Sequence, residues 1–464
     1  MSSVSSLSID ILAPGDVDHL MSMGLAGPSD NGMRKVHRRR LNRSSDQENA
    51  HIPLNTDPRS RPDAFATIPD KLFSKETIVY LGFNGDKATE IWNGWNNWPA
   101  SPPRREIDPD DGGLEVTFLD WVKGRAGYSN DVWEDDTAAW LNCMQHWGIA
   151  TELQHAIMDK HFKSVRLTGT CIGWVRDTIK MRYAGLEDIQ RASGERERAY
   201  PTTNFASSAS GSGSGQGLSA ASSGRSISGM QRDALPGISI DSCSSTQAIA
   251  SQNAPGMTVL YRGMDQARIN RLFDNQGNLD AIGVIGSPPQ TDFSRYKTMY
   301  YFTTSFEAAK RYAGWAKRRD NVQSVVVLRI AIHNSAIEGM PQGKIQRIFW
   351  PSPEWKELIW RCRNNVNLSK DLVKYNHAAI IIGTTAGKPN QYYYKYSSSA
   401  QLTEDCVLKV KGPTGQQPAV QFVFSVEEGE ELLADALRST RKFFSFSTTD
   451  LEAWMDEQEN EIGE

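Results

Sequence analysis

The segment VLYRGM, Val259 to Met264, carries the pattern from which the fold of this 464-residue chain is read. Its β-branched and aromatic residues predict a short strand. The strand ends in Arg262, which is followed by Gly263. A guanidinium at a strand end suits bidentate binding of a phosphate or a ribose, and the glycine lets a ligand approach the backbone. The alternative is a surface arginine before a turn.

The region around this segment, residues 254–426, is rich in predicted strands. One helix stands out, SFEAAKRYAGWAKRR, which Ser305 caps and which carries an apolar stripe. Its last basic residues, Lys317 to Arg319, suit the negative end of the helix dipole. Few helices among many strands predict an α+β fold. The further strands are predicted at TMYYFTT, SVVVLRIAI, KELIWRC, AAIIIGTTA, CVLKVKG and AVQFVFSVE.

The N-terminal segment, residues 1–72, is polar and short of large apolar side chains. It is predicted to be disordered, because it buries too little apolar surface to offset the loss of entropy. It contains the cluster MRKVHRRRLNR, whose basic residues lie at positions 34–43. The cluster favours a nuclear import signal, with solvated charge and a cytoplasmic location as the alternatives. Direct nucleic-acid binding is not expected, since no aromatic side chains alternate with the cations.

Three more regions follow from composition. Residues 74–192 contain eight of the thirteen tryptophans and predict a compact all-α domain, with these side chains in its core. Residues 193–252 are rich in serine and glycine and predict a flexible linker. Residues 427–464 are acidic and predict an exposed helix followed by a frayed end.

Composition also limits the function classes. A net charge of −4 and a pI near 6.1 give no general attraction to nucleic acid or membrane. The five cysteines are scattered and form no CxxC pair, which fits a reducing compartment and predicts no metal site. There is no secretory signal pattern and no apolar run long enough for a membrane helix. An intracellular protein without a membrane partner is expected.

Two further stretches place polar groups beside aromatic residues. In YYFTTSFEAAKRYA, an aromatic strand ends at Thr303, Thr304 and Ser305, whose hydroxyls suit a ribose or an amide; the alternative is strand termination with helix capping. In WPSPEWKELIW, Glu357 begins a predicted apolar strand. A carboxylate is costly there unless it is paired or used, and the alternative is an edge position facing water.

The order of these elements resembles the Arg–Ser/Thr–Glu group of the ADP-ribosyltransferase superfamily, over roughly residues 256–411. The resemblance implies that Arg262 helps to hold NAD and that Thr303, Thr304 and Ser305 support the nicotinamide-ribose pocket. It implies that Glu357 is catalytic and stabilises an oxocarbenium-like transition state as nicotinamide leaves.

The resemblance also suggests how substrates are surrounded. Gly263 belongs to the NAD site, and Tyr312 is expected to form part of an aromatic wall for nicotinamide. The loop at residues 344–356 is expected to bind the acceptor, with Trp350 and Trp355 exposed to it. The whole chain is also similar to uncharacterised fungal proteins with a tryptophan-rich N-terminal half, which implies no function.

Two functions follow. The first is an NAD-dependent mono-ADP-ribosyltransferase that modifies a protein or another macromolecule. The second is a catalytically inactive relative that serves as an interaction or scaffold protein, for example in a nuclear complex, with an unknown protein partner. The retained Arg262 and Glu357 favour the enzyme. The second function is favoured by the threonine at 303 and by Trp355, which stands where arginine-directed members carry Glu or Gln.

Overall fold

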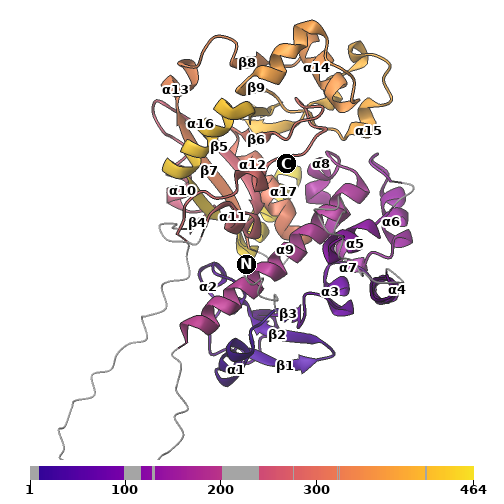
Figure 1. Ribbon diagram of the computed structural model, residues 1–464, viewed down its shortest axis with the longest axis vertical. Coiled ribbons are helices and arrows are strands. Elements are labelled where there is room, and N and C mark those ends of the chain that lie inside the picture. The colour runs from indigo at the N-terminus through magenta and orange to yellow at the C-terminus, as the bar shows by residue number, and fades with distance from the viewer. Residues whose placement is uncertain are drawn as a thin grey trace, which may run out of the picture.

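The computed structural model describes most of the chain and combines helices with a large mixed sheet, as the predicted α+β class requires (Figure 1). The sheet belongs to the C-terminal half, and the N-terminal half is mainly helical. The described residues are 10–98, 116–127, 131–200, 240–274, 276–320, 322, 324–412 and 415–463. Most of the predicted linker, residues 201–239, lies outside them, while residues 193–199 continue a long helix.

The N-terminal half contains these helices and strands: α1 (Pro14–Ser22), β1 (Ala26–Asp30), β2 (Met33–His37), α2 (Ser45–Glu48), β3 (Phe65–Pro69), α3 (Lys75–Tyr80), α4 (Gly85–Asn97), α5 (Phe118–Gly124), α6 (Thr137–His146), α7 (Thr151–Ile157), α8 (Lys163–Arg166) and α9 (Cys171–Ala199).

The C-terminal half contains these: β4 (Ile240–Ser242), α10 (Thr246–Ala250), β5 (Met257–Asp265), α11 (Gln266–Leu272), β6 (Tyr300–Thr303), α12 (Phe306–Arg319), β7 (Val325–His333), α13 (Asn334–Glu338), β8 (Ile345–Ile348), α14 (Pro353–Arg363), β9 (Ile380–Thr384), α15 (Asn390–Tyr393), β10 (Lys409–Gly412), β11 (Gly415–Pro418), β12 (Val420–Phe424), α16 (Val426–Ser439), β13 (Lys442–Ser445) and α17 (Thr448–Gly463).

The main sheet has eight strands in the order β4-β13-β7-β5-β6-β12-β9-β8. Its neighbours are antiparallel except β4 with β13 and β8 with β9. Both faces of its centre are covered. Along β7, Val325 and Val327 join the core shared with the N-terminal half, whereas Val326 and Leu328 join a second core on the opposite face. Alternate side chains of a strand point to opposite faces, so β7 is apolar on both faces from Val325 to Leu328.

The described residues 427–463 are part of the fold rather than a tail. The prediction of an acidic tail with a frayed end is wrong for the described residues, because β13 pairs with β7 inside the main sheet. Phe443 and Phe444 are buried on its two faces. Trp454 of α17 stacks on Phe162 with ring centroids 5.0 Å apart. The aromatic residues outweigh the acidic composition because they bury large apolar areas.

The prediction of disorder for residues 1–72 is also wrong for residues 10–72. The basic cluster forms β2, which pairs with β1 and β3, and a short 3₁₀ helix after it. Two of its arginines have clear partners: Arg39 Nε donates to Asp46 at 2.6 Å, and Arg38 Nε donates to the Asp63 carbonyl at 2.8 Å. These charges, which look solvated in the sequence, are therefore neutralised or hydrogen-bonded. Nuclear import remains a prediction.

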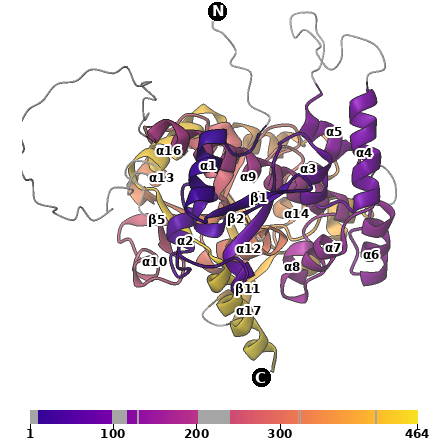
Figure 2. The same ribbon diagram turned by 90° about the horizontal axis from the view of Figure 1, so that it is seen from below.

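The two halves share one hydrophobic core instead of forming separate domains. Trp140 of the helical half is in the same cluster as Trp315 of α12 and Val325 of the sheet. Helix α12 lies between the sheet and the helical half, with α9 crossing beside it (Figure 1). Seen from below, α17 projects from the same junction (Figure 2). The tryptophan-rich region therefore supplies one side of a common core.

The cations at the end of α12 hold this junction through carboxylates of the N-terminal half. Lys317 pairs with Glu48 at 2.6 Å, and both side chains are buried. Arg318 pairs with Asp159, and Arg319 pairs with Asp177 at 2.8 Å. Pairing between the halves, rather than the helix dipole alone, explains the Lys-Arg-Arg run.

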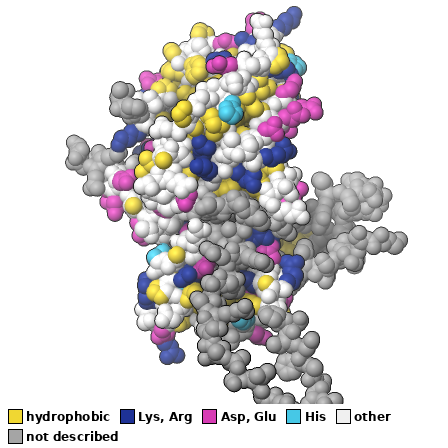
Figure 3. All heavy atoms as spheres, turned by 90° about the vertical axis from the view of Figure 1, so that its left-hand side faces the viewer, with side chains coloured by type: hydrophobic (Ala, Val, Ile, Leu, Met, Phe, Trp, Pro, Cys, Tyr) yellow, Lys and Arg dark blue, Asp and Glu magenta, His cyan; other side chains and the backbone are white. Residues whose placement is uncertain are grey.

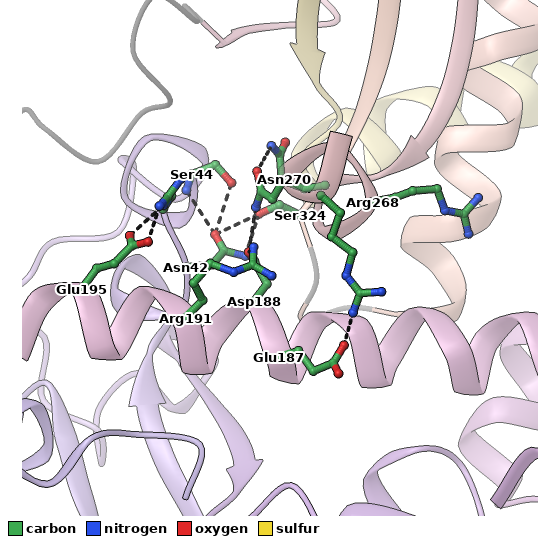
Figure 4. Close-up of polar contacts among 12 residues, drawn as sticks. Asn42, Ser44, Glu187, Asp188, Arg191, Glu195, Arg268, Asn270 and Ser324 are labelled. Atoms are coloured by element: carbon green, nitrogen blue, oxygen red, sulfur yellow. Dashed lines mark hydrogen bonds and ion pairs between the residues drawn. The ribbon is translucent and has the colours of Figure 1, made fainter. Parts of the chain in front are cut away.

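A second polar junction joins α9 to α11 and to the loop before α2 (Figure 4). Asp188 Oδ1 accepts a hydrogen bond from Asn270 Nδ2 at 2.8 Å, and Arg43 Nε donates to Glu195 at 2.8 Å. Asp188 is buried, and its burial raises its pKa. The junction therefore contains a carboxyl group whose charge is disfavoured.

The face of the molecule drawn in Figure 3 carries charges of both signs. None of the described helices is both long and apolar enough to cross a membrane. On the face drawn in Figure 3, basic and acidic side chains are interspersed with hydrophobic ones. This mixture agrees with the small net charge of −4.

Candidate functional site

A pocket of about 310 Å³ lies between the middle of the main sheet and the first turns of α12. We call it the Arg262 pocket. It contains four of the residues that the sequence predicts for a site: Arg262, Gly263, Thr303 and Tyr312. The remaining lining residues are Tyr261, Ser287, Tyr301, Phe302, Ala308, Ala309, Thr385, Leu408, Ala419 and Gln421.

Arg262 enters the pocket from β5, which is fixed between β7 and β6. Its Nη1 donates to the carbonyl oxygens of Ile285 at 2.6 Å and Tyr301 at 3.4 Å. Its Nε and Nη2 have no partner among the described residues, and they are not sealed from solvent. Two donors of one guanidinium therefore remain free to meet a ligand.

The Arg262 charge has no paired carboxylate in the described part of the chain. Asp265 attracts it from a distance, but that carboxylate pairs with Arg268 at 3.4 Å. Burial, followed by repulsion from Arg268, lowers the pKa of Arg262 to about 9. The side chain stays cationic at neutral pH, so the pocket holds an uncompensated positive charge that favours an anion.

Gly263 has a different role from the one predicted. A Cβ at this position would lie 2.2 Å from the Ala309 carbonyl oxygen and 2.7 Å from the Ala313 nitrogen. The glycine is therefore required for close packing of α12 on β5, and its proposed purpose of admitting a ligand to the backbone is not needed. Gly263 still lines the pocket because α12 forms one wall of it.

Of the three predicted hydroxyls, only that of Thr303 lies in the pocket wall. It donates to the Val420 carbonyl at 3.3 Å and accepts from the Ser305 nitrogen at 3.1 Å. Ser305 caps α12 by accepting from the Ala308 nitrogen. Thr304 does not line the pocket, and its nitrogen donates to Val420. Strand termination and helix capping account for Thr304 and Ser305.

Aromatic side chains form much of the wall, as the sequence predicts for Tyr312. Tyr301, Phe302 and Tyr312 all line the pocket. Burial raises the pKa of Tyr312, so its hydroxyl stays neutral at physiological pH. The Tyr301 hydroxyl donates to Thr291 Oγ1 at 2.6 Å and also lies 3.9 Å from the Met299 sulfur. The wall therefore offers flat apolar surface suited to a ring.

Glu357 is not in this pocket, and the prediction that it begins a strand is wrong. It lies on helix α14, which Ser352 caps and Pro353 opens. The segment is helical because Trp355, Leu358, Ile359 and Cys362 recur at spacings of three and four residues and are all buried. An apolar run that also has this spacing fits a helix better than a strand.

The Glu357 carboxylate also has protein partners of its own. It pairs with Arg361 one turn along the helix and accepts a hydrogen bond from Ser399. Burial opposes its charge, but these two partners prevail and the pKa of Glu357 is lowered. A carboxylate engaged in this way, outside the pocket, does not support a catalytic role.

The predicted acceptor loop also differs from expectation. Trp355 is fully buried and donates its indole N–H to the Thr384 carbonyl at 2.9 Å. Trp350 is half-buried and packs edge-on against Trp355. Phe349 is the exposed aromatic residue of this loop, at 41%. The two tryptophans therefore stabilise the lobe around α14 and do not present a surface to a partner.

Sequence reasoning missed Gln421, which lies opposite Thr303 on the neighbouring strand β12. Its side chain lines the pocket and is 5% exposed. A lone polar residue inside the apolar run AVQFVF was the available signal, since such a residue needs a buried partner. That partner is Asp292, which accepts from Gln421 Nε2 at 2.7 Å. No residue that lines the described pocket is acidic.

Comparison with known proteins adds no assignment. Searches against protein-family models, curated proteins and solved structures find no match for this chain. The site is therefore interpreted from its geometry and chemistry.

Proposed function

We propose that this chain is an ADP-ribosyltransferase-like protein that binds NAD or ADP-ribose in the Arg262 pocket without transferring ADP-ribose, and that it acts as an interaction protein. The observation that carries the proposal is the pocket lining. Arg262, Thr303 and Tyr312 converge there, whereas no carboxylate does. The presence of Arg262, Thr303 and Tyr312 supports binding of a nucleotide. The lack of a carboxylate among the described lining residues argues against transfer of ADP-ribose.

Binding is supported by the free donors of Arg262. A guanidinium with two unused donor nitrogens, Nε and Nη2, matches a phosphate oxygen pair in geometry and charge. The aromatic wall around it suits a nicotinamide or adenine ring. The volume of about 310 Å³ is at the small end for ligand pockets, which suits a mononucleotide part of a dinucleotide.

Absence of transfer is supported by the chemistry of the bond to be broken. Cleavage of a glycosidic bond through a cationic sugar requires a carboxylate near the anomeric carbon. The lining residue opposite Thr303 is Gln421, whose amide carries no charge. Asp292 lies behind this amide and is already held by Arg363 and by the Ala386 nitrogen.

The test is calorimetry and turnover on the same preparation of the full chain. NAD and ADP-ribose are expected to bind with 1:1 stoichiometry, and labelled NAD is expected to release no nicotinamide. Arg262→Met is expected to abolish binding. Failure of both ligands to bind would refute the proposal. Nicotinamide release that requires the pocket would also refute it, and labelled ADP-ribose on an acceptor would then identify transfer, whereas free ADP-ribose would identify hydrolysis.

A further inference from the structure

The Gln421 side chain is anchored at one end and open at the other. Its Nε2 donates to Asp292 Oδ2 at 2.7 Å. Its Oε1 has no partner among the described residues, yet it is not sealed from solvent. Since the residue is 5% exposed and lines the Arg262 pocket, this oxygen opens on the pocket. The pocket therefore contains a hydrogen-bond acceptor as well as a cation.

The orientation of this amide is set by the partners of Asp292. Asp292 is 3% exposed and accepts from three donors: the Arg363 guanidinium, the Ala386 nitrogen at 2.9 Å and Gln421 Nε2. A carboxylate accepts hydrogen bonds and donates none. The reversed amide would place two oxygen atoms against each other, so only one orientation of Gln421 is stable.

Asp292 is itself held firmly. Burial opposes the charge of Arg363, but attraction to Asp292 outweighs it and raises the pKa of that guanidinium. Arg363 Nη1 also donates to Asn390 Oδ1 at 2.9 Å. The pair is therefore a permanent buried anchor from which Gln421 is positioned.

We propose that Asp292 is a positioning residue that fixes the Gln421 carbonyl oxygen toward the pocket, and that among nucleotides this acceptor makes the Arg262 pocket prefer those that present a hydrogen-bond donor to it together with an anionic group. The proposal rests on the proposed function and specifies its ligand. A site built around a buried acceptor rejects an analogue that lacks the donor, because the acceptor is then left without a partner.

A nicotinamide nucleotide offers two such donors, the carboxamide NH₂ and the ribose hydroxyls. Calorimetry on the full chain shows which of these two donors meets Gln421, with nicotinamide mononucleotide as the reference ligand. Nicotinic acid mononucleotide lacks the carboxamide donor, and the deoxyribose analogue lacks a hydroxyl donor. The wild-type chain is expected to bind the reference at least about tenfold more tightly than one of these two analogues.

The matched variant is Gln421→Met, which keeps the length of the side chain and removes the acceptor. It is expected to bind the reference and the disfavoured analogue equally. Inorganic pyrophosphate, which needs only Arg262, is expected to bind wild type and variant alike. A preference that survives in Gln421→Met, or a wild type that binds the reference without any preference, would overturn this inference while leaving the proposed function intact. No binding of the reference by the wild type would refute both.

Asp292→Asn tests the positioning role, and it is expected to lose the same preference while still binding pyrophosphate. If this variant does not fold, hydrogen exchange of the Gln421 side-chain amide in the wild-type chain reports on the same bond. Slow exchange of this NH₂ is expected. Exchange at the rate of a free amide would show that Asp292 does not hold it.

Discussion

The junction between the two halves and the Arg262 pocket both contain buried cations, but only the junction supplies them with carboxylates. Lys317 is paired with Glu48, and Arg319 is paired with Asp177. Arg262 instead donates to carbonyl oxygens and keeps two donors free. A paired buried cation holds two parts of a fold together, whereas an unpaired one is a cost that a bound anion relieves. The contrast distinguishes a structural cation from a binding one.

Glu48→Ala breaks the junction by removing the carboxylate that pairs with the buried Lys317. Both side chains are almost fully buried, so removal of one partner is expected to lower the free energy of unfolding by about 3–5 kcal/mol. Denaturant unfolding of the full chain measures this. The matched control is Glu307→Ala, which breaks an exposed pair on the same helix and is expected to change stability by less than about 1 kcal/mol. Equal effects of the two would contradict the structural role.

Arg262→Met tests the other side of the comparison. Loss of the anion contact is expected to weaken ADP-ribose binding by about 2–5 kcal/mol. Stability is expected to stay the same or rise, because the variant removes a desolvated charge that has no paired carboxylate. Calorimetry and denaturant unfolding are measured on the same protein. A large loss of stability would place Arg262 with the junction cations.

Gly263→Ala perturbs the element that the two regions share. The new Cβ would meet backbone atoms of α12, the nearer at 2.2 Å, and backbone cannot move aside as a side chain can. Displacement of α12 is expected to cost about 1–3 kcal/mol in stability and to weaken ligand binding as well. Gly283→Ala is the control, since nothing lies within 4 Å of its Cβ position. An unchanged stability in Gly263→Ala would argue against the tight packing of α12 on β5.

The pH dependence of ligand binding sharpens the comparison further. The pKa of Arg262 is lowered to about 9, mainly by burial, and anion binding requires the protonated form. Affinity is therefore expected to be constant below pH 8 and to fall by up to about tenfold per pH unit above pH 9. Calorimetry between pH 7 and pH 10.5 measures the profile. An affinity that stays constant up to pH 10.5 would show that ligand binding does not depend on the charge of Arg262.

Asp188→Asn is expected to have the smallest effect on stability. It changes the buried carboxyl group at the second polar junction, between α9 and α11. Burial raises the pKa of Asp188 in the folded chain above its ordinary value. Its stabilising contribution is therefore present in acid, where the folded and unfolded chains both hold the proton, and is lost as pH rises through the folded pKa. Asparagine does not ionise, so the loss of stability with rising pH is absent in Asp188→Asn. Its side-chain oxygen can still accept a hydrogen bond from Asn270.

Asp188→Asn is therefore expected to be slightly more stable than wild type above neutral pH, by no more than about 1.5 kcal/mol, and to lose this advantage in acid. Unfolding at pH 4.5 and pH 8 compares the two. Asp435→Asn, an exposed site paired with Arg438, serves as control and is expected to show no such pH dependence. A variant that is less stable than wild type at pH 8 would mean that the charged form of Asp188 is needed.

Local sequence is sufficient to predict a helix or strand where the interactions that determine that element are short in range. Helix α12 begins and ends close to where residue type predicts, because the Ser305 cap and the apolar stripe act within a few residues. Strand β5 is also present, but it continues to Asp265, so the prediction that it ends in Arg262 is wrong and Arg262 lies inside the strand. The segment around Glu357 carries two conflicting short-range signals. Its apolar content predicts a strand, whereas the spacing of residues 355, 358, 359 and 362 predicts the helix that the structure contains.

By itself, therefore, the sequence determined the α+β class and the presence of Arg262 on β5, Thr303 on β6 and Tyr312 on α12. Only the tertiary structure decided which cations are paired, because Lys317 and Glu48 are 269 positions apart. It also brought Gln421 opposite Thr303 and left Glu357 outside the pocket. Ion pairs and strand pairing join residues across space, and a pattern that spans a few residues carries no information about such partners.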